Sequence, residues 1–136
     1  MKGDNCIFCK IANGEIPSAT LYEDEMVRVI LDISPASKGH ALILPKEHYA
    51  NLYEIDEDCA KHVIVTAKKL AQKMKEELKL EGLNVVQNNG EIAGQTVFHY
   101  HMHLIPRYQG DQVNVGWKPG EATQEYKDEM VGKLAL

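Results

Sequence analysis

Three histidines alternate with apolar residues in one short stretch of the chain, at His99, His101 and His103. In a β-strand, side chains two residues apart point to the same face, so this histidine row predicts imidazoles about 6.6 Å apart along the strand. Such a row can contact one phosphate group with more than one ring, and histidine is suited to nucleophilic and acid–base chemistry near neutral pH. The apolar residues between them are expected to be buried behind the row: Phe98, Tyr100, Met102 and Leu104.

Two cysteines three residues apart, Cys6 and Cys9, lie near the N-terminus of the chain. Two thiolates at this spacing can bind one tetrahedral zinc, and two further ligands are then needed. The candidates are His48, which follows an expected strand end, and His99, which opens the histidine row. The alternative is two buried thiols without a metal. A redox pair is disfavoured, because the N-terminal segment lacks the βαβ context of thioredoxin-like proteins.

Two loops contain polar groups that could bind a small anionic or hydroxylated ligand. Asp32 lies between apolar residues and could accept hydrogen bonds from the paired hydroxyls of a ribose, although Asp is also common in turns. The amide of Gln95 and the hydroxyl of Thr96 come just before the histidine row and could hold phosphate oxygens. Either loop could equally be an ordinary polar connection.

The composition limits the classes of protein that this chain can be. Its 136 residues fit one domain, and no apolar run is long enough to cross a bilayer. The first five residues are polar and lack the apolar stretch of a signal peptide, so a cytoplasmic protein is expected. A net charge of −5 argues against broad binding to nucleic acids or acidic membranes.

The expected secondary structure is one long helix among short strands. Apolar residues form a single stripe at helical spacing over residues 56–78. A short helix is expected at residues 5–13, capped by Asp4 or Asn5, and residues from 121 onward predict a short helix or a frayed end. Strands are expected at residues 20–23, 26–31, 41–44, 83–87 and 97–105. This order predicts an α+β domain.

These residues together resemble the histidine triad (HIT) family of nucleotide hydrolases. The resemblance extends from about residue 5 to about residue 107, and the segment Trp117-Lys118-Pro119-Gly120 is similar to the tail of the Hint-like branch. The matching segments, in chain order, are Cys6-Ile7-Phe8-Cys9-Lys10-Ile11, Glu15-Ile16-Pro17, Leu31-Asp32-Ile33-Ser34-Pro35, residues 39–46, Gly94-Gln95-Thr96-Val97 and residues 99–105.

The resemblance implies a HIT-like α+β fold, an antiparallel sheet with one long and one short N-terminal helix. It also implies a single domain over residues 1–136, with a core at about 5–107 and an extension at 108–136. Two copies would form a homodimer in which their sheets join into one, with a nucleotide cleft on each subunit.

The resemblance also implies roles for individual residues. His101 corresponds to the nucleophile, and His103 and His40 correspond to its phosphate-facing neighbours, with His99 completing the triad. The nucleotide would be bound by Phe8, Ile11, Ile30, Asp32, Ile33, Asn88, Gln95 and Thr96. A structural zinc would be held by Cys6, Cys9, His48 and His99.

The implied activity is hydrolysis of a purine nucleoside monophosphate conjugate. His103 favours hydrolysis over transfer, because the nucleotidyltransferase relatives have Gln there, whereas the run from Leu104 to Arg107 is closer to the branch acting on dinucleoside polyphosphates. Phosphoramidates and acyl-adenylates are the other expected substrates. Two alternatives remain: a metallohydrolase in which the histidine row binds catalytic zinc, and a non-catalytic nucleotide-binding dimer.

Overall fold

The computed structural model describes residues 5–136 and contains one antiparallel sheet with helices on both faces. The strands lie in the order β1-β2-β3-β5-β4, and every neighbouring pair is antiparallel. The elements are α1 (Ile7–Ala12), β1 (Thr20–Glu23), β2 (Val27–Leu31), β3 (Ala41–Pro45), α2 (Glu57–Glu77), β4 (Gly82–Val86), the 3-10 turn η1 (Glu91–Ala93), β5 (Met102–Arg107) and α3 (Gln124–Leu134). The expected α+β fold is confirmed.

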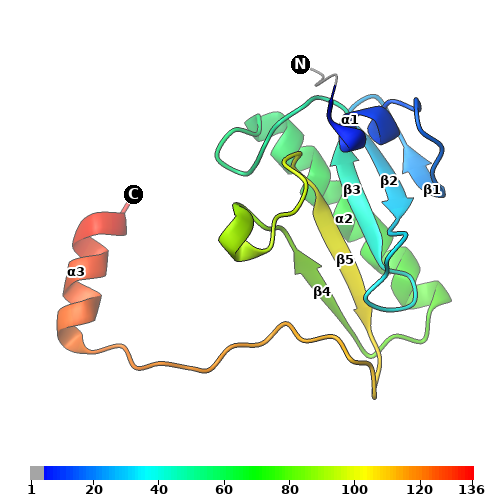
Figure 1. Cartoon of the computed structure of the whole chain (residues 1–136). Coiled ribbons are helices and arrows are strands. Elements are labelled where there is room, and N and C mark those ends of the chain that lie inside the picture. The colour runs from blue at the N-terminus through cyan, green and yellow to red at the C-terminus, as the bar shows by residue number, and fades with distance from the viewer. Residues whose placement is uncertain (1–4) are drawn as a thin grey trace.

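The long helix α2 covers one face of the sheet, and the short helix α1 lies on the other (Figure 1). The Asp56 carboxylate caps α2 by accepting a hydrogen bond from the Cys59 backbone N–H. Val63, Ala67 and Met74 of the predicted stripe are buried against the sheet. Burial of this stripe is the main force that fixes α2 on the sheet, because isolated helices of this kind are marginal in water.

Successive side chains of β2 and β3 point to opposite faces of the sheet. Val29 and Ile43 belong to the core beneath α2. Their neighbours Ile30 and Leu42 point to the opposite face, where Phe8 of α1 packs against them. The two faces therefore have separate environments on the same strands.

Three local expectations were wrong. Helix α1 begins at Ile7, and Cys6 is its N-cap, with Sγ accepting a hydrogen bond from the Cys9 N–H; Asp4 lies outside the described residues. The last strand begins only at Met102, so two of the three histidines precede it. Phe98 is 53% exposed rather than buried, because residues before Met102 leave the regular strand alternation.

The C-terminal extension leaves the sheet after β5. Residues 112–123 form an extended segment without regular structure, and α3 follows at a distance from the sheet (Figure 1). None of the described residues of α3 is buried. Among residues 5–136, no helix has both the length and the apolar character required to cross a bilayer.

Gly39 ends the loop that delivers His40 to the start of β3, and it has a φ of +92°. A Cβ at this position would lie 2.7 Å from Leu78 Cδ1 and 3.3 Å from Pro106 Cγ. We expect Gly39→Ala to lower the free energy of unfolding by about 1–3 kcal/mol, chiefly because L-residues rarely adopt this φ. Urea denaturation measures the change.

Gly120→Ala is the matched control, because Gly120 lies in the extended segment and its added Cβ would meet no atom within 4 Å. Its effect should stay within about 0.5 kcal/mol. Equal stabilities of the two variants would contradict the argument from φ.

Candidate active site and metal centre

The ring of His101 is held in one orientation by a backbone carbonyl. Its Nδ1 lies 2.7 Å from the carbonyl oxygen of His99. A carbonyl can only accept, so Nδ1 carries the proton and Nε2 of the neutral ring keeps a free lone pair. The ring is 7% exposed, and Phe8 packs edge-on against it with ring centroids 4.9 Å apart. His101 thus has the tautomer that a nitrogen nucleophile requires.

His40 and His103 form a second oriented pair. The backbone N–H of Ala36 donates to His40 Nδ1 at 2.9 Å, so the proton of neutral His40 is on Nε2. That Nε2 lies 2.9 Å from His103 Nδ1 and 3.5 Å from the carboxylate of Asp32. If His103 Nδ1 accepts this proton, the neutral His103 ring carries its own proton on Nε2. The backbone N–H of Ala36 therefore determines that His40 donates and His103 accepts in the hydrogen bond between the two rings.

Burial keeps these rings neutral. Desolvation lowers the pKa of His101 and of His40, while the negative charge of Asp32 partly opposes both shifts. Desolvation, together with the neighbouring rings of His101 and His40, lowers the pKa of His103 to about 4. At neutral pH the three rings therefore offer lone pairs and N–H donors rather than fixed positive charges.

A cleft of about 440 Å³ opens in front of His101 and His103. Its walls are mostly apolar, and Asp32 and Ser34 lie at one side. This combination suits a flat ring with a polar, hydroxylated substituent. Of the expected ligand-binding residues, the cleft is lined by Phe8, Ile11, Ile30, Asp32, Ile33, Thr96, His101 and His103.

Gln95 and Asn88 do not line this cleft. Gln95 is 1% exposed, and its Oε1 accepts from the Gly90 N–H at 2.8 Å. Its Nε2 donates to the carbonyls of Ala50, at 2.6 Å, and Val97, at 3.2 Å. In this structure Gln95 fastens the loop that leads into the histidine row, and Asn88 is partly buried in the same loop.

Several lining residues were not identified from the sequence. Leu42 faces the cleft because it pairs directly with His103 across the sheet, which strand alternation could have indicated. The Ala36 N–H, which bonds to His40 and does not line the cleft, was also not identified; it is a backbone donor, so no side-chain pattern could have indicated it. The other unexpected lining residues are Ile7, Ile16, Pro17, Ser18, Leu31 and Ser34.

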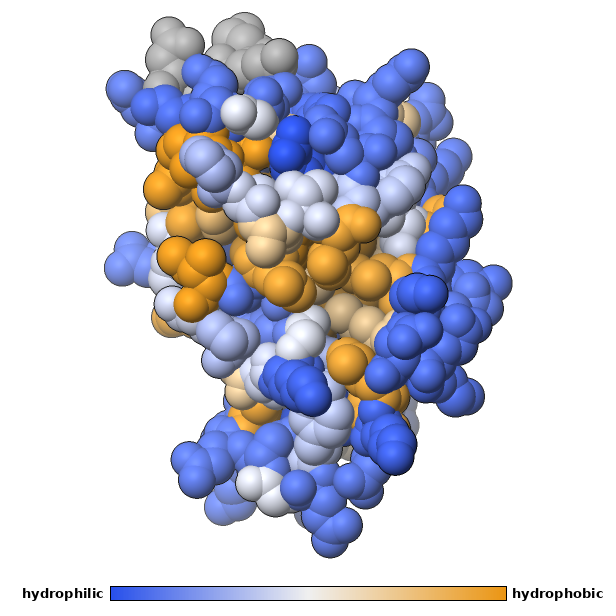
Figure 2. Space-filling model, turned by 90° about the vertical axis from the view of Figure 1, so that its right-hand side faces the viewer, coloured by the Kyte–Doolittle hydropathy of each residue, from blue (hydrophilic) through white to orange (hydrophobic). Residues whose placement is uncertain are grey.

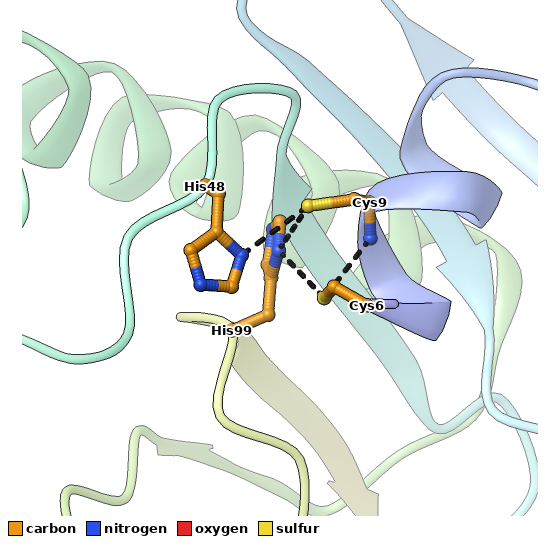
Figure 3. A group of neighbouring side chains, drawn as sticks. All are labelled: Cys6, Cys9, His48 and His99. Atoms are coloured by element: carbon orange, nitrogen blue, oxygen red, sulfur yellow. Dashed lines mark hydrogen bonds between the residues drawn. The ribbon is translucent and has the colours of Figure 1, made fainter. Parts of the chain in front are cut away.

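The first histidine of the row, His99, does not face the cleft with the other two. It is fully buried, and its ring lies among Cys6, Cys9 and His48 (Figure 3). Its Nε2–H donates to the Pro45 carbonyl at 2.8 Å, so its Nδ1 lone pair points at the cysteines. Cysteine and histidine side chains are thus brought together from α1, the end of β3 and the segment before β5.

The four ligand atoms of this cluster have the spacing of a tetrahedral zinc site. Cys9 Sγ lies 3.3 Å from His99 Nδ1 and 3.2 Å from His48 Nδ1, and Cys6 Sγ lies 3.4 Å from His99 Nδ1. All four atoms lie within 4.8 Å of one another. Around a tetrahedral zinc, sulfur and nitrogen ligands would be roughly 3.5 Å apart, so the Cys₂His₂ donor set fits this metal. The carbonyl bonded to His99 supplies the second-sphere partner that zinc-binding histidines use.

Comparison with known proteins agrees with this geometry. The HIT domain family model matches residues 13–110. "Protein hit" of Bacillus subtilis is 50% identical over 97% of this chain and 90% of its own length. The adenosine 5'-monophosphoramidase HNT1 of Saccharomyces cerevisiae is 45% identical over 95% of this chain and 77% of its own length.

Solved structures show the same fold. A HIT family protein from Bacillus anthracis superposes with a TM-score of 0.91 at 42% identity, covering 98% of this chain and 97% of its own. A Zn-bound histidine triad family protein from Mycobacterium smegmatis has a TM-score of 0.76 at 36% identity, covering 85% of this chain and 84% of its own. From the matched domain, the paired histidines in the cleft and these relatives, we conclude that the chain belongs to the HIT family.

Proposed function

We propose that this protein hydrolyses conjugates of a purine nucleoside monophosphate at the α-phosphorus, through a covalent intermediate on His101. The observation that carries the proposal is the hydrogen bond from His101 Nδ1 to the His99 carbonyl, which leaves Nε2 unprotonated at the wall of the cleft. The yeast relative that bears the name adenosine 5'-monophosphoramidase supports a purine phosphoramidate as a substrate. Acyl-adenylates and dinucleoside polyphosphates are the alternative conjugates.

The first step forms a bond between His101 Nε2 and phosphorus. As the N–P bond forms, the bond from phosphorus to the leaving group breaks, and the leaving group takes a proton. His103 is our first choice for the group that delivers this proton, because its Nε2 is the N–H donor when Nδ1 accepts from His40. His40 is the second choice. The proton is taken up from solvent as the anionic substrate binds, so the ring of His103 is neutral again after it has delivered the proton. The resulting positive charge on His101 is stabilised by its hydrogen bond to the His99 carbonyl.

The second step returns the enzyme to its starting state. A water molecule attacks the same phosphorus in line with His101, the N–P bond breaks, and a nucleoside monophosphate leaves. One proton of the water returns to the group that delivered a proton to the leaving group, and the other leaves with the nucleoside monophosphate. Dividing the reaction into two displacements replaces one difficult step with two easier ones.

Binding would use the apolar and polar sides of the cleft separately. We propose that Phe8, Ile11, Ile30 and Ile33 enclose the base, while the Asp32 carboxylate accepts hydrogen bonds from the ribose hydroxyls. Thr96 and His103 would contact the phosphoryl oxygens. Asn88 and Gln95, which were expected to contact the phosphate, would instead shape the loop that leads into the histidine row; the bonds of Gln95 to three backbone groups favour this structural role.

We further propose that Cys6, Cys9, His48 and His99 hold a structural zinc, that residues 1–136 form one domain, and that the protein acts as a homodimer. The Cys₂His₂ geometry and the Zn-bound relative support the metal. When bound, zinc would fix the ring of His99 and so the carbonyl that orients His101. It would also occupy the His99 lone pair, which removes that ring from proton transfer.

Replacement of the nucleophile gives the first test of the function. We expect His101→Ala to lower kcat on an adenosine phosphoramidate by at least about 10⁴-fold, while AMP still binds with a similar Kd because the residues proposed to enclose the base and ribose are unchanged. Turnover by chromatography and calorimetric AMP binding measure the two effects. Near-normal turnover in His101→Ala would refute the assignment of the nucleophile.

Trapping the intermediate distinguishes the alternatives. The reaction is quenched with alkali rather than acid, because phosphorus–histidine bonds are labile in acid. Mass spectrometry should then find a nucleotidyl adduct on His101. A metallohydrolase with zinc on the histidine row would form no adduct and would lose activity with its metal. The structure does not group the row as such a site, because His99 lies with Cys6, Cys9 and His48, whereas His103 lies with Asp32 and His40. A non-catalytic binding dimer would release no AMP.

Removal of the metal gives a third prediction. The purified protein should contain about one zinc per chain, and a strong chelator should lower its melting temperature by roughly 10 °C, because a ligand bound tightly to the folded state alone stabilises that state. Cys9→Ser should abolish both the zinc content and the chelator response. Cys59→Ala is the control, since Cys59 is buried on α2 outside the cluster and should keep both.

The buried His103 predicts how stability depends on pH. Its folded pKa is about 4 against an ordinary value of 6.5, so between these values the unfolded chain binds a proton that the folded chain excludes. The contribution of His103 to the free energy of unfolding is therefore complete above pH 6.5 and falls as pH decreases toward about 4.

Urea denaturation between pH 7 and pH 4 should show a smaller acid loss of stability for His103→Gln than for the wild type. Glutamine does not titrate, and its Oε1 can still accept from His40. Identical pH slopes for the two proteins would show that His103 is not the buried titrating group described here.

A further inference from the structure

A second cavity, of about 330 Å³, lies on the face of the sheet opposite to the histidine cleft. It is formed between the edge strand β1 and the long helix α2. Val29 of β2 lines this cavity, whereas the adjacent Ile30 lines the cleft, so the two are separated by the thickness of one strand. The proposed hydrolysis uses no residue of this second cavity.

Its inner surface is apolar and accessible. Leu21 of β1 and Val65 of α2 are about half exposed here, and Val29 and Leu70 provide the floor and wall. Figure 2, which looks at the β1 side of the molecule, shows apolar surface in the middle of this face and a strongly hydrophilic strip beside it. The volume lies at the lower end of the range of small-molecule sites.

The charged groups around the cavity are cationic. Lys69 and Lys73 lie one helical turn apart on α2 and both line it, and no acidic side chain is among its described lining residues. Two like charges at this spacing repel each other. Lys73 Nζ is 3.6 Å from Glu77 Oε1, but both groups are largely exposed, so this pair offsets little of that repulsion. In a chain of net charge −5, this cationic border is a local exception.

A carboxylate lies close to the cavity but is already fully bonded. Asp24 Oδ1 accepts from the N–H groups of Met26 and Val27, at 2.8 and 2.9 Å. Its Oδ2 accepts from the Tyr22 hydroxyl at 2.8 Å and from His62 Nε2 at 2.6 Å. These bonds fix Tyr22 and His62, the two ring side chains that line the cavity, and Asp24 itself is not among the lining residues.

We propose that this cavity is a second ligand site, which binds a small amphipathic anion. The apolar part of the ligand packs on Leu21, Val65 and Leu70, and its carboxylate or phosphate lies between Lys69 and Lys73. The site is independent of the proposed hydrolase function, because it shares no residue with the cleft. An anion between the two lysines would relieve their mutual repulsion, and this charge complementarity selects the ligand class.

Titration of the ¹⁵N-labelled full chain with octanoate tests the proposal, with 1-octanol as the uncharged control. Octanoate should shift the amide signals of residues around Leu21, Val65 and Leu70 at low ionic strength, and octanol should bind several-fold more weakly. The double variant Lys69→Gln/Lys73→Gln should weaken octanoate binding about three- to tenfold. High salt should have a similar effect.

Two further variants make the test specific. Val65→Glu places a carboxylate at the half-exposed wall of the cavity and should abolish octanoate binding. Lys61→Gln/Lys68→Gln removes two exposed lysines of the same helix that do not line the cavity, and it should leave the affinity unchanged. Shifts confined to the histidine cleft, or equal binding of octanol, would overturn the proposal.

Sedimentation of the same samples examines the competing occupant, a second copy of this chain. If octanoate or the Lys69→Gln/Lys73→Gln change alters the mass of the particle, the cavity is an interface between copies and the ligand proposal is wrong. An unchanged mass together with the expected shifts supports a small-molecule site.

Discussion

One residue, His99, connects the scaffold of the cleft to its reactive ring. Its imidazole Nε2–H is bonded to the Pro45 carbonyl at the end of β3, and its Nδ1 faces Cys6 and Cys9 of the N-terminal segment. Its own carbonyl receives the proton of His101 Nδ1. Because the side chain is held on two sides, the carbonyl of the same residue has a defined direction, and the tautomer of His101, the proposed nucleophile, follows from it. The proposed catalytic geometry therefore depends on a fully buried side chain that does not itself face the cleft.

Backbone groups, rather than charged side chains, determine the protonation pattern of the site. The carbonyl of His99 fixes the proton of His101 on Nδ1. The N–H of Ala36 fixes the proton of His40 on Nε2, next to His103. Backbone groups do not titrate, so these two hydrogen-bond partners are the same at every pH at which the rings are neutral. Burial acts in the same direction, because it disfavours the charged form of each ring. The result is a set of neutral imidazoles whose donors and acceptors are already arranged before a substrate arrives.

The sequence predicted the parts of this site that depend on periodicity and motif. The stripe of α2 predicted its limits to within one residue, and the spacing of Cys6, Cys9, His48 and His99 predicted a cluster that the fold assembles. It did not predict that the histidine row divides between two environments. Regular alternation was assumed through residues 97–105, whereas the strand starts at Met102, and the backbone bends at residues 97–99, where His99 lies with the cysteines. Such a departure comes from tertiary bonds, such as that from the Tyr100 N–H to the Tyr49 carbonyl, which no local pattern contains.

The acidity of the chain is compatible with the proposed binding of a phosphate, because the charged side chains are unevenly placed. Among the described residues, Asp32 is the one carboxylate that lines the cleft, and it lies 3.5 Å from His40 Nε2. Its field partly offsets the lowering of the histidine pKa values, so it makes transient positive charge on these rings less costly in the proposed reaction. A carboxylate placed closer to the phosphate would repel it, and one placed farther away would leave the buried rings unable to accept charge. The position of Asp32, at the side of the cleft and next to the second pair of histidines, satisfies both requirements.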